Sequence, residues 1–125
     1  MKPPVGHVRV SAKGKDILIK IKRNTGLEHW NEICRIALCY SLANPTKPPF
    51  INKNGDSSID MDWKIFAGRF QDELTALIAL RAMKDGIHVK DNDTFIEYFR
   101  AHIERGISSI SSINLSNICN NGIKS

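Results

Sequence analysis

The stretch NTGLEHWNEICRIALCYSL, residues 24–42, contains the end of one expected helix and almost the whole of the next. Gly26 can adopt the left-handed conformation that ends a helix, and Leu27 can cover that end. From about Glu28 to Leu42 the sequence is apolar on nearly all sides. A helix of this kind packs against several neighbours, so we expect it at the centre of a helical domain.

The rest of the chain gives two similar stop signals, at Gly86 and Gly106. Helices are expected from Ser11 to about 23, over 71–85 with a wide apolar face, and from Asp91 or Asn92 to 106. His7–Val10 alternates polar and apolar residues, which predicts a short strand. The sequence therefore predicts a mainly α fold, a compact bundle of about four to five helices with one short N-terminal extended segment.

Between the central helix and the helix at 71–85, residues 43–62 contain three prolines and an Asn-Gly pair, which are typical of a loop. We expect Phe50 and Ile51 to attach this loop to the core. Its acidic residues, Asp56, Asp60 and Asp62, fit no calcium-loop spacing and are expected in solvent. The apolar segment 63–68 is interpreted as either a packed helical turn or an extended piece.

With 125 residues the chain is long enough for one domain. We expect a single helical domain over 1–110, followed by a Ser/Asn-rich tail over 111–125. The N-terminus lacks the apolar region of a secretory signal, and no apolar run approaches the roughly 20 residues needed to cross a bilayer. These features predict a cytoplasmic protein.

Catalytic and metal-binding patterns are weak in this sequence. The three cysteines, at positions 34, 39 and 119, have neither disulfide nor zinc-site spacing, so buried reduced thiols are expected. The four histidines are scattered, and His102 is expected to be packed rather than catalytic. No Gly-rich phosphate loop is present. We therefore predict no enzyme activity, no catalytic residues, no metal and no cofactor.

The positive signal is the distribution of charge. The whole net charge of +5 lies in residues 1–35, which hold eight basic and three acidic side chains. Such a localised excess favours DNA, RNA or an acidic protein surface as the partner. At helical spacing Lys13 and Lys20 lie on one flank of the first helix and Lys15 and Lys22 on the other. We predict that DNA phosphates are contacted by Arg9, Lys13, Lys15, Lys20, Lys22 and Arg23.

Ile19 lies on the same outer side of the first helix as Arg23. Two interpretations stay open for it, an ordinary exposed residue or a subunit contact. Trp30 is expected to pack in the core, which favours contact with the duplex backbone over stacking on single strands.

Several short motifs resemble those of the DNA sulfur modification protein DndE family. They are NTGL (24–27), Trp30 with CRIALC (34–39) and SL (41–42), the Phe66-Ala67-Gly68 turn and HIERG (102–106). The likeness runs from about Val8 to Ile107. It implies a small, mostly helical, non-catalytic DNA-binding component of the bacterial DNA phosphorothioation machinery, in which other proteins carry out the sulfur chemistry: a cysteine desulfurase, an iron–sulfur protein and an ATPase-like subunit.

The same resemblance implies a homo-oligomer, a tetramer, that favours nicked duplex DNA and binds it through surface lysines. By position these are Lys13, Lys15, Lys20, Lys22 and Arg23. Two other interpretations remain. The order of strand, basic helix, Gly turn and helix over 7–42 also resembles a ribbon–helix–helix repressor, in which His7 and Arg9 would read bases. The chain could instead be a module that binds acidic or scaffold proteins of the modification complex.

Overall fold

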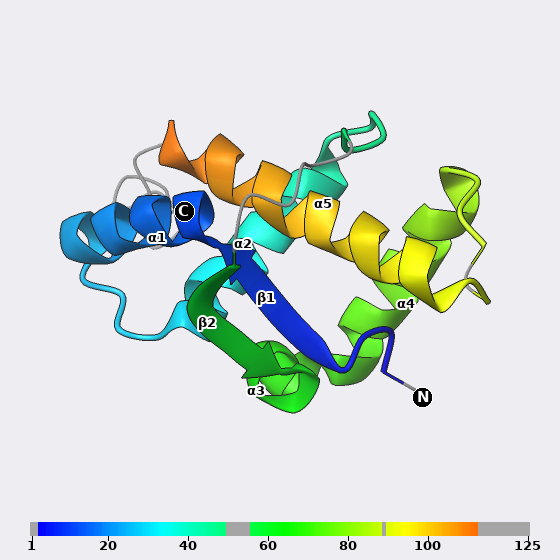
Figure 1. Ribbon diagram of the computed structural model, residues 1–125, viewed down its shortest axis with the longest axis horizontal. Coiled ribbons are helices and arrows are strands. Elements are labelled where there is room, and N and C mark those ends of the chain that lie inside the picture. Colours follow the sequence, from blue (N-terminus) through cyan, green and yellow to red (C-terminus); the bar gives the residue numbers. More distant parts are fainter. Residues whose placement is uncertain (1–2, 50–55, 89, 113–125) are drawn as a thin grey trace, which may run out of the picture.

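A computed structural model describes residues 3–49, 56–88 and 90–112 (Figure 1). The predictions about Phe50, Ile51 and Cys119, and those about almost all of the tail, lie outside these residues. The elements, in order, are β1 (His7–Ser11), α1 (Ala12–Thr25), α2 (Trp30–Ala43), β2 (Asp56–Asp62), α3 (Trp63–Ala67), a 3-10 turn (Gly68–Phe70), α4 (Gln71–Lys84) and α5 (Asn92–Ser111). The predicted mainly α fold is confirmed.

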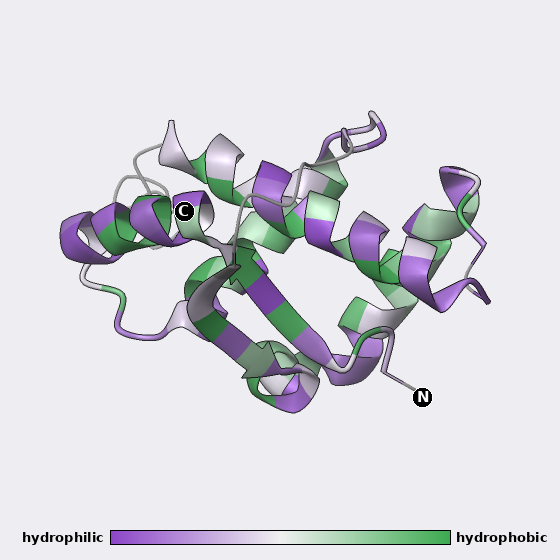
Figure 2. Cartoon of the chain, viewed as in Figure 1, coloured by the Kyte–Doolittle hydropathy of each residue, from purple (hydrophilic) through white to green (hydrophobic). Residues whose placement is uncertain are grey.

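The core forms where α2 crosses α5, the longest helix, which runs across the upper side of the molecule in Figure 1. On α2 the side chains of Ile33, Cys34, Ala37 and Leu38 are completely buried. This confirms that the segment after Gly26 is a central helix. Figure 2 shows apolar residues on the sides of these two helices that meet.

The third predicted helix stop is wrong, because α5 continues through Gly106 to Ser111. A Cβ at position 106 would lie only 1.9 Å from the carbonyl oxygen of Ala37. Gly106 therefore allows two helices to touch rather than ending one. The other two stops are confirmed: Gly26 and Gly86 have left-handed φ values of 76° and 77°, directly after or just beyond the ends of α1 and α4.

A small antiparallel sheet pairs β1 with β2 (Figure 1). The prediction of a loop over 43–62 is therefore wrong for its last seven residues. Val8 and Val10 of β1 and Ile59 and Met61 of β2 are buried, while the polar residues between them face outward. This alternation along both strands is visible in Figure 2 and is the pattern of a sheet with one wet face.

Local hydrogen bonds fix α1 and the start of α5. The Ser11 hydroxyl accepts from the backbone N–H of Gly14 at 2.9 Å, and the Asp91 carboxylate accepts from Thr94 at 3.3 Å. Both predicted N-caps are thus confirmed. Leu18 and Ile21 bury one side of α1, and Ile19 on the opposite side is 37% exposed. None of the described helices is long and apolar enough to cross a bilayer.

Two arginines hold the chain where it leaves α2. Arg81 of α4 is buried and donates to the carbonyl oxygens of Leu42, Asn44 and Thr46 at 2.6–2.8 Å. Its Nε also lies 3.0 Å from Asp85. Arg105 of α5 donates to the backbone and hydroxyl oxygens of Ser41 and Thr46. The last carbonyls of α2, which have no partner within the helix, are satisfied in this way.

The same cluster contains a buried tyrosine, a histidine and an aspartate. The Tyr98 hydroxyl donates to Asp85 at 2.5 Å, and burial together with this bond raises the pKa of Tyr98. Burial alone would raise the pKa of Asp85, but the bond from Tyr98 and the charge of Arg81 outweigh it and lower that pKa. His102 is completely buried, with Nδ1 2.7 Å from the Ser41 hydroxyl. It is packed, as predicted.

Acid is expected to destabilise the fold through His102. Burial, then the charges of Arg105 and Arg81, lower its pKa to about 4, against about 6.5 in the unfolded chain. Below about pH 6.5 the unfolded chain binds the proton first, so stability falls as the pH drops towards 4, by up to about 3 kcal/mol. Urea unfolding of wild type and His102→Gln at pH 7, 5.5 and 4.5 measures this. Equal pH slopes in both proteins would contradict the assignment.

Candidate nucleic-acid interface

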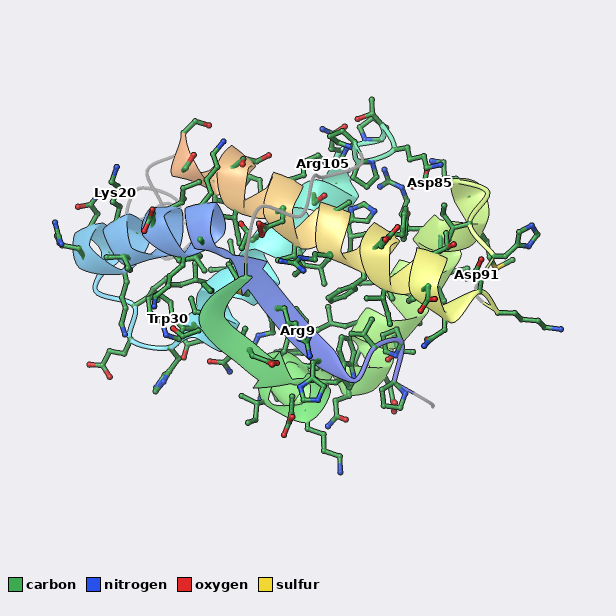
Figure 3. All side chains as sticks on the ribbon, in the orientation of Figure 1. Arg9, Lys20, Trp30, Asp85, Asp91 and Arg105 are labelled. Atoms are coloured by element: carbon green, nitrogen blue, oxygen red, sulfur yellow. The ribbon has the colours of Figure 1, made fainter. Side chains whose placement is uncertain are left out.

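The basic residues predicted to bind DNA lie mainly on α1, which forms one end of the molecule (Figure 3). Along α1, Lys13, Lys20 and Arg23 are exposed, and Lys15 and Lys22 are half-buried. Figure 3 shows Lys20 pointing away from the body of the protein. Because α1 has 14 residues, these charges are spread over about 20 Å.

One flank of α1 faces α5. There Lys13 lines a groove of about 420 Å³, together with Gly14, Glu104, Arg105 and Ser108. Arg105 already donates to Ser41 and Thr46, and Glu104 brings a negative charge into the groove. The groove is therefore of mixed charge. On this flank of α1 the positive charges that face solvent are those of Lys13 and Lys20.

The other flank faces β2 and the turn after α1. Lys15 donates to the hydroxyl of Ser58 at 2.7 Å, and the Lys22 ammonium lies 4.5 Å from the ring centre of Trp30. Trp30 is half-buried, so the expectation that it packs in the core holds only in part. A hydroxyl and an indole ring carry no net charge. Lys15 and Lys22 are thus positioned without being neutralised, and their field still reaches solvent.

Arg9 is placed differently from the rest of the set. It lies on β1, well apart from Lys20 in Figure 3, and its Nε is 3.5 Å from the Asp60 carboxylate. His7 lies 3.0 Å from Asp60 and 3.5 Å from Asp62. Asp60 and Asp62 are exposed to solvent, as expected, and Asp60 also offsets the charge of Arg9. The structure brings together the five basic residues of α1 but leaves Arg9 outside the group.

This pairing also bears on the ribbon–helix–helix alternative. In that fold two β-strands enter the major groove and their side chains read bases. Here β1 pairs with β2 of the same chain, and its outward side chains, His7 and Arg9, contact Asp60 and Asp62. The described residues give this alternative no support.

The described residues contain free thiols but no cluster of metal ligands. No group of three or more His, Cys, Asp or Glu side chains that could hold a metal ion occurs in the described part of the chain. Cys34 is buried, and burial followed by the charge of Glu104 raises its pKa to about 12, so its thiol stays protonated at neutral pH. Cys39 is a free thiol as well but is exposed, which corrects the expectation that it is buried.

Fold and surface together define a small helical protein with five basic residues on one 14-residue helix near its N-terminus. Over residues 7–117 the sequence matches the family described as DNA sulphur modification protein DndE, and the chain belongs to this family. It is therefore a DndE-family DNA sulphur modification protein. No curated protein matches the sequence.

Two solved structures share the fold. One is the crystal structure of DndE from Escherichia coli B7A, described as involved in DNA phosphorothioation modification, with a TM-score of 0.68 and 21% identity. The match covers 85% of this chain and 96% of that one. The other is a glycine-to-lysine mutant of DndE, with a TM-score of 0.64 and 18% identity over 86% of this chain and 98% of that one.

Proposed function

We propose that this protein is a non-catalytic DNA-binding component of the phosphorothioation machinery, and that α1 holds the backbone of duplex DNA, nicked duplex included. The observation that carries the proposal is the set of five basic side chains on this single 14-residue helix at one end of the molecule. Membership of a family named for DNA sulphur modification makes DNA the natural partner of that charge.

The spacing on α1 suits a phosphate backbone. Lys13 and Lys20 are two helical turns apart, about 10 Å. On each strand a phosphate occurs about every 3.4 Å along the duplex axis, so a helix laid along the backbone brings both ammonium groups within reach of phosphates. Lys15 and Lys22 repeat this spacing on the other flank. Arg9 is expected to contribute less than these four lysines, because Asp60 already offsets its charge.

Reversing the freely exposed charges of α1 tests the proposal. In the triple variant Lys13→Glu, Lys20→Glu, Arg23→Glu we expect duplex affinity to fall at least about 100-fold at 100 mM salt. Each lost phosphate contact removes about 0.9 from the slope of log affinity against log salt, so the slope should fall by about 2.7. Fluorescence anisotropy with intact and nicked duplexes over 50–200 mM salt measures both quantities.

A matched control carries the same change of charge elsewhere: Lys47→Glu, Lys64→Glu and Arg69→Glu, three exposed residues outside α1. A control variant that binds nearly as wild type shows that the effect depends on position rather than on net charge. If the α1 variant keeps its helical circular dichroism and its affinity, α1 is not the DNA-binding surface.

We also propose that the protein works as a homo-oligomer, a tetramer, and together with other DNA sulfur modification proteins. Support comes from the apolar side chains that the described surface leaves exposed. On α4, Leu77 and Leu80 are 50% and 64% exposed. The sequence placed both on an apolar face of this helix, and neither belongs to the core.

A further inference from the structure

One line of residues on the outside of α4 has an unusual order. Glu73, Leu77, Leu80 and Lys84 follow one another at spacings of four, three and four residues. At 100° per residue all four lie within about 60° of one another on the helix surface. All four are exposed, and the two leucines are among the most exposed apolar side chains described. We call these four residues the α4 stripe.

An apolar groove lies beside the α4 stripe. It has a volume of about 590 Å³ and runs between α4 and α2, with Leu77 on its edge and Ile36, Tyr40, Phe70 and Leu74 among its other lining residues. Leu77 thus belongs both to the stripe and to the lining of the groove. Two neighbouring exposed leucines beside such a groove are typical of a surface that another helix covers.

The order of residues in the stripe is symmetric. The midpoint between Leu77 and Leu80 coincides with the midpoint between Glu73 and Lys84, between Ile78 and Ala79. If α4 packs antiparallel against a second α4 across a two-fold axis at this point, Leu77 meets the partner's Leu80. Glu73 then meets the partner's Lys84. The contact then contains two leucine–leucine pairs and two pairs of opposite charge, because the two-fold axis repeats each pair.

We propose that the α4 stripe is a docking surface for a second copy of this chain, in an antiparallel α4–α4 contact. A two-fold contact uses the same patch on both subunits, so the patch must be complementary to itself. The stripe meets this requirement. A contact with a different protein would not require the stripe to be complementary to itself. The 3–4 spacing of the leucine and charge positions is also that of helices packed at about 20°. The proposal rests on the oligomer proposed above and adds the surface.

Parallel packing is disfavoured by the same residues. In a parallel pair Glu73 would face the partner's Glu73, and Lys84 the partner's Lys84. Like charges directly opposite each other destabilise a contact. The charge order along α4 therefore selects the antiparallel arrangement.

Charge exchange gives the sharpest test. Lys84→Glu alone and Glu73→Lys alone should each weaken self-association at least about 5-fold at low salt, because two attractive pairs become repulsive. The double variant Glu73→Lys, Lys84→Glu should return to near the wild-type dissociation constant, because the pairs are opposite again. Sedimentation velocity of the full chain over a concentration series measures each constant, and circular dichroism confirms that each variant is folded.

Replacing a leucine of the stripe tests the apolar part of the proposed α4–α4 contact. Leu80→Glu should weaken self-association at least about 100-fold. The matched control is Met83→Glu, which changes an even more exposed residue about a quarter of a turn away from the stripe and should leave the constant within about 2-fold.

The possible results separate the two proposals. A wild-type chain that is monomeric at all concentrations overturns the oligomer and the stripe together, and leaves DNA binding by α1 to be judged on its own. An oligomeric wild type whose assembly is insensitive to Leu80→Glu, or in which the double charge exchange restores nothing, overturns the stripe alone.

Discussion

Replacing Gly106 by alanine is expected to remove much of the stability of the domain, at least about 3 kcal/mol, at the upper end of what overpacking costs. The added Cβ would sit 1.9 Å from the carbonyl oxygen and 2.4 Å from the carbonyl carbon of Ala37. These are backbone atoms of a buried helix, so they cannot rotate aside as a side chain would. The helices α2 and α5 must separate, and the completely buried Ile33, Leu38 and Ile103 would lose close packing.

A glycine-to-alanine change normally stabilises a helix slightly, so the sign of this prediction is informative. The measurement is the free energy of unfolding from urea titration. Gly6→Ala is the matched control, because no atom lies within 4 Å of a Cβ at that position, and it should change stability by less than about 0.5 kcal/mol. A neutral or stabilising Gly106→Ala would mean that α2 and α5 do not approach this closely.

Arg81→Met is the second change with a large expected effect, about 3–5 kcal/mol of lost stability. Methionine keeps much of the apolar volume of the side chain but removes all the donors. The carbonyl oxygens of Leu42 and Asn44 lose their arginine partner, and that of Thr46 keeps only Arg105. The Asp85 carboxylate stays buried without a cation. A buried charge that has lost its partner costs more than the pair contributed.

A second change, at Asp85, separates the cost of the lost hydrogen bonds from the cost of the unpaired buried charge. In Arg81→Met, Asp85→Asn the loss should be smaller than in Arg81→Met alone, because no charge remains to be desolvated. Arg69→Met serves as the control for loss of an arginine at an exposed site, where the guanidinium only stacks 5.0 Å from the Phe70 ring. If Arg69→Met and Arg81→Met cost the same, the buried hydrogen bonds are not what Arg81 supplies.

Local sequence signals predicted much of this fold. The cap at Ser11, the cap at Asp91 and the stops at Gly26 and Gly86 act within one turn of a helix, so neighbouring residues suffice to identify them. The central helix also followed from its own composition. β2 was missed although Ile59-Asp60-Met61-Asp62 alternates in the way a strand does. The prolines and the Asn-Gly pair that precede these four residues are typical of a loop, and they led to the prediction of a loop over the whole segment.

Features that depend on a distant partner were not predictable in this way. A glycine followed by an isoleucine lies just beyond the end of α4, at Gly86, but inside α5, at Gly106. The difference at Gly106 is the close approach of Ala37 from α2, which the local sequence does not show. The basic residues proposed to bind DNA show the same limit. The helical spacing of the α1 lysines is local, and Lys15 and Lys22 do lie on the flank that faces β2 and Trp30. The neutralisation of Arg9 by Asp60 required the pairing of β1 with β2, which the sequence did not reveal.

The polar cluster at the end of α2 affects how the chain folds during its synthesis. Ser41 and His102, which meet in the core, are 61 positions apart, and His7 and Asp60, which meet on the outer face of the sheet, are 53 apart. Contacts that complete the fold are therefore highly non-local. Such contacts form slowly, because long segments must be brought together first. During synthesis α1 and α2 emerge before β2 and α5 exist, with the apolar sides of α2 uncovered. The native structure is thus completed only after α5 has been made.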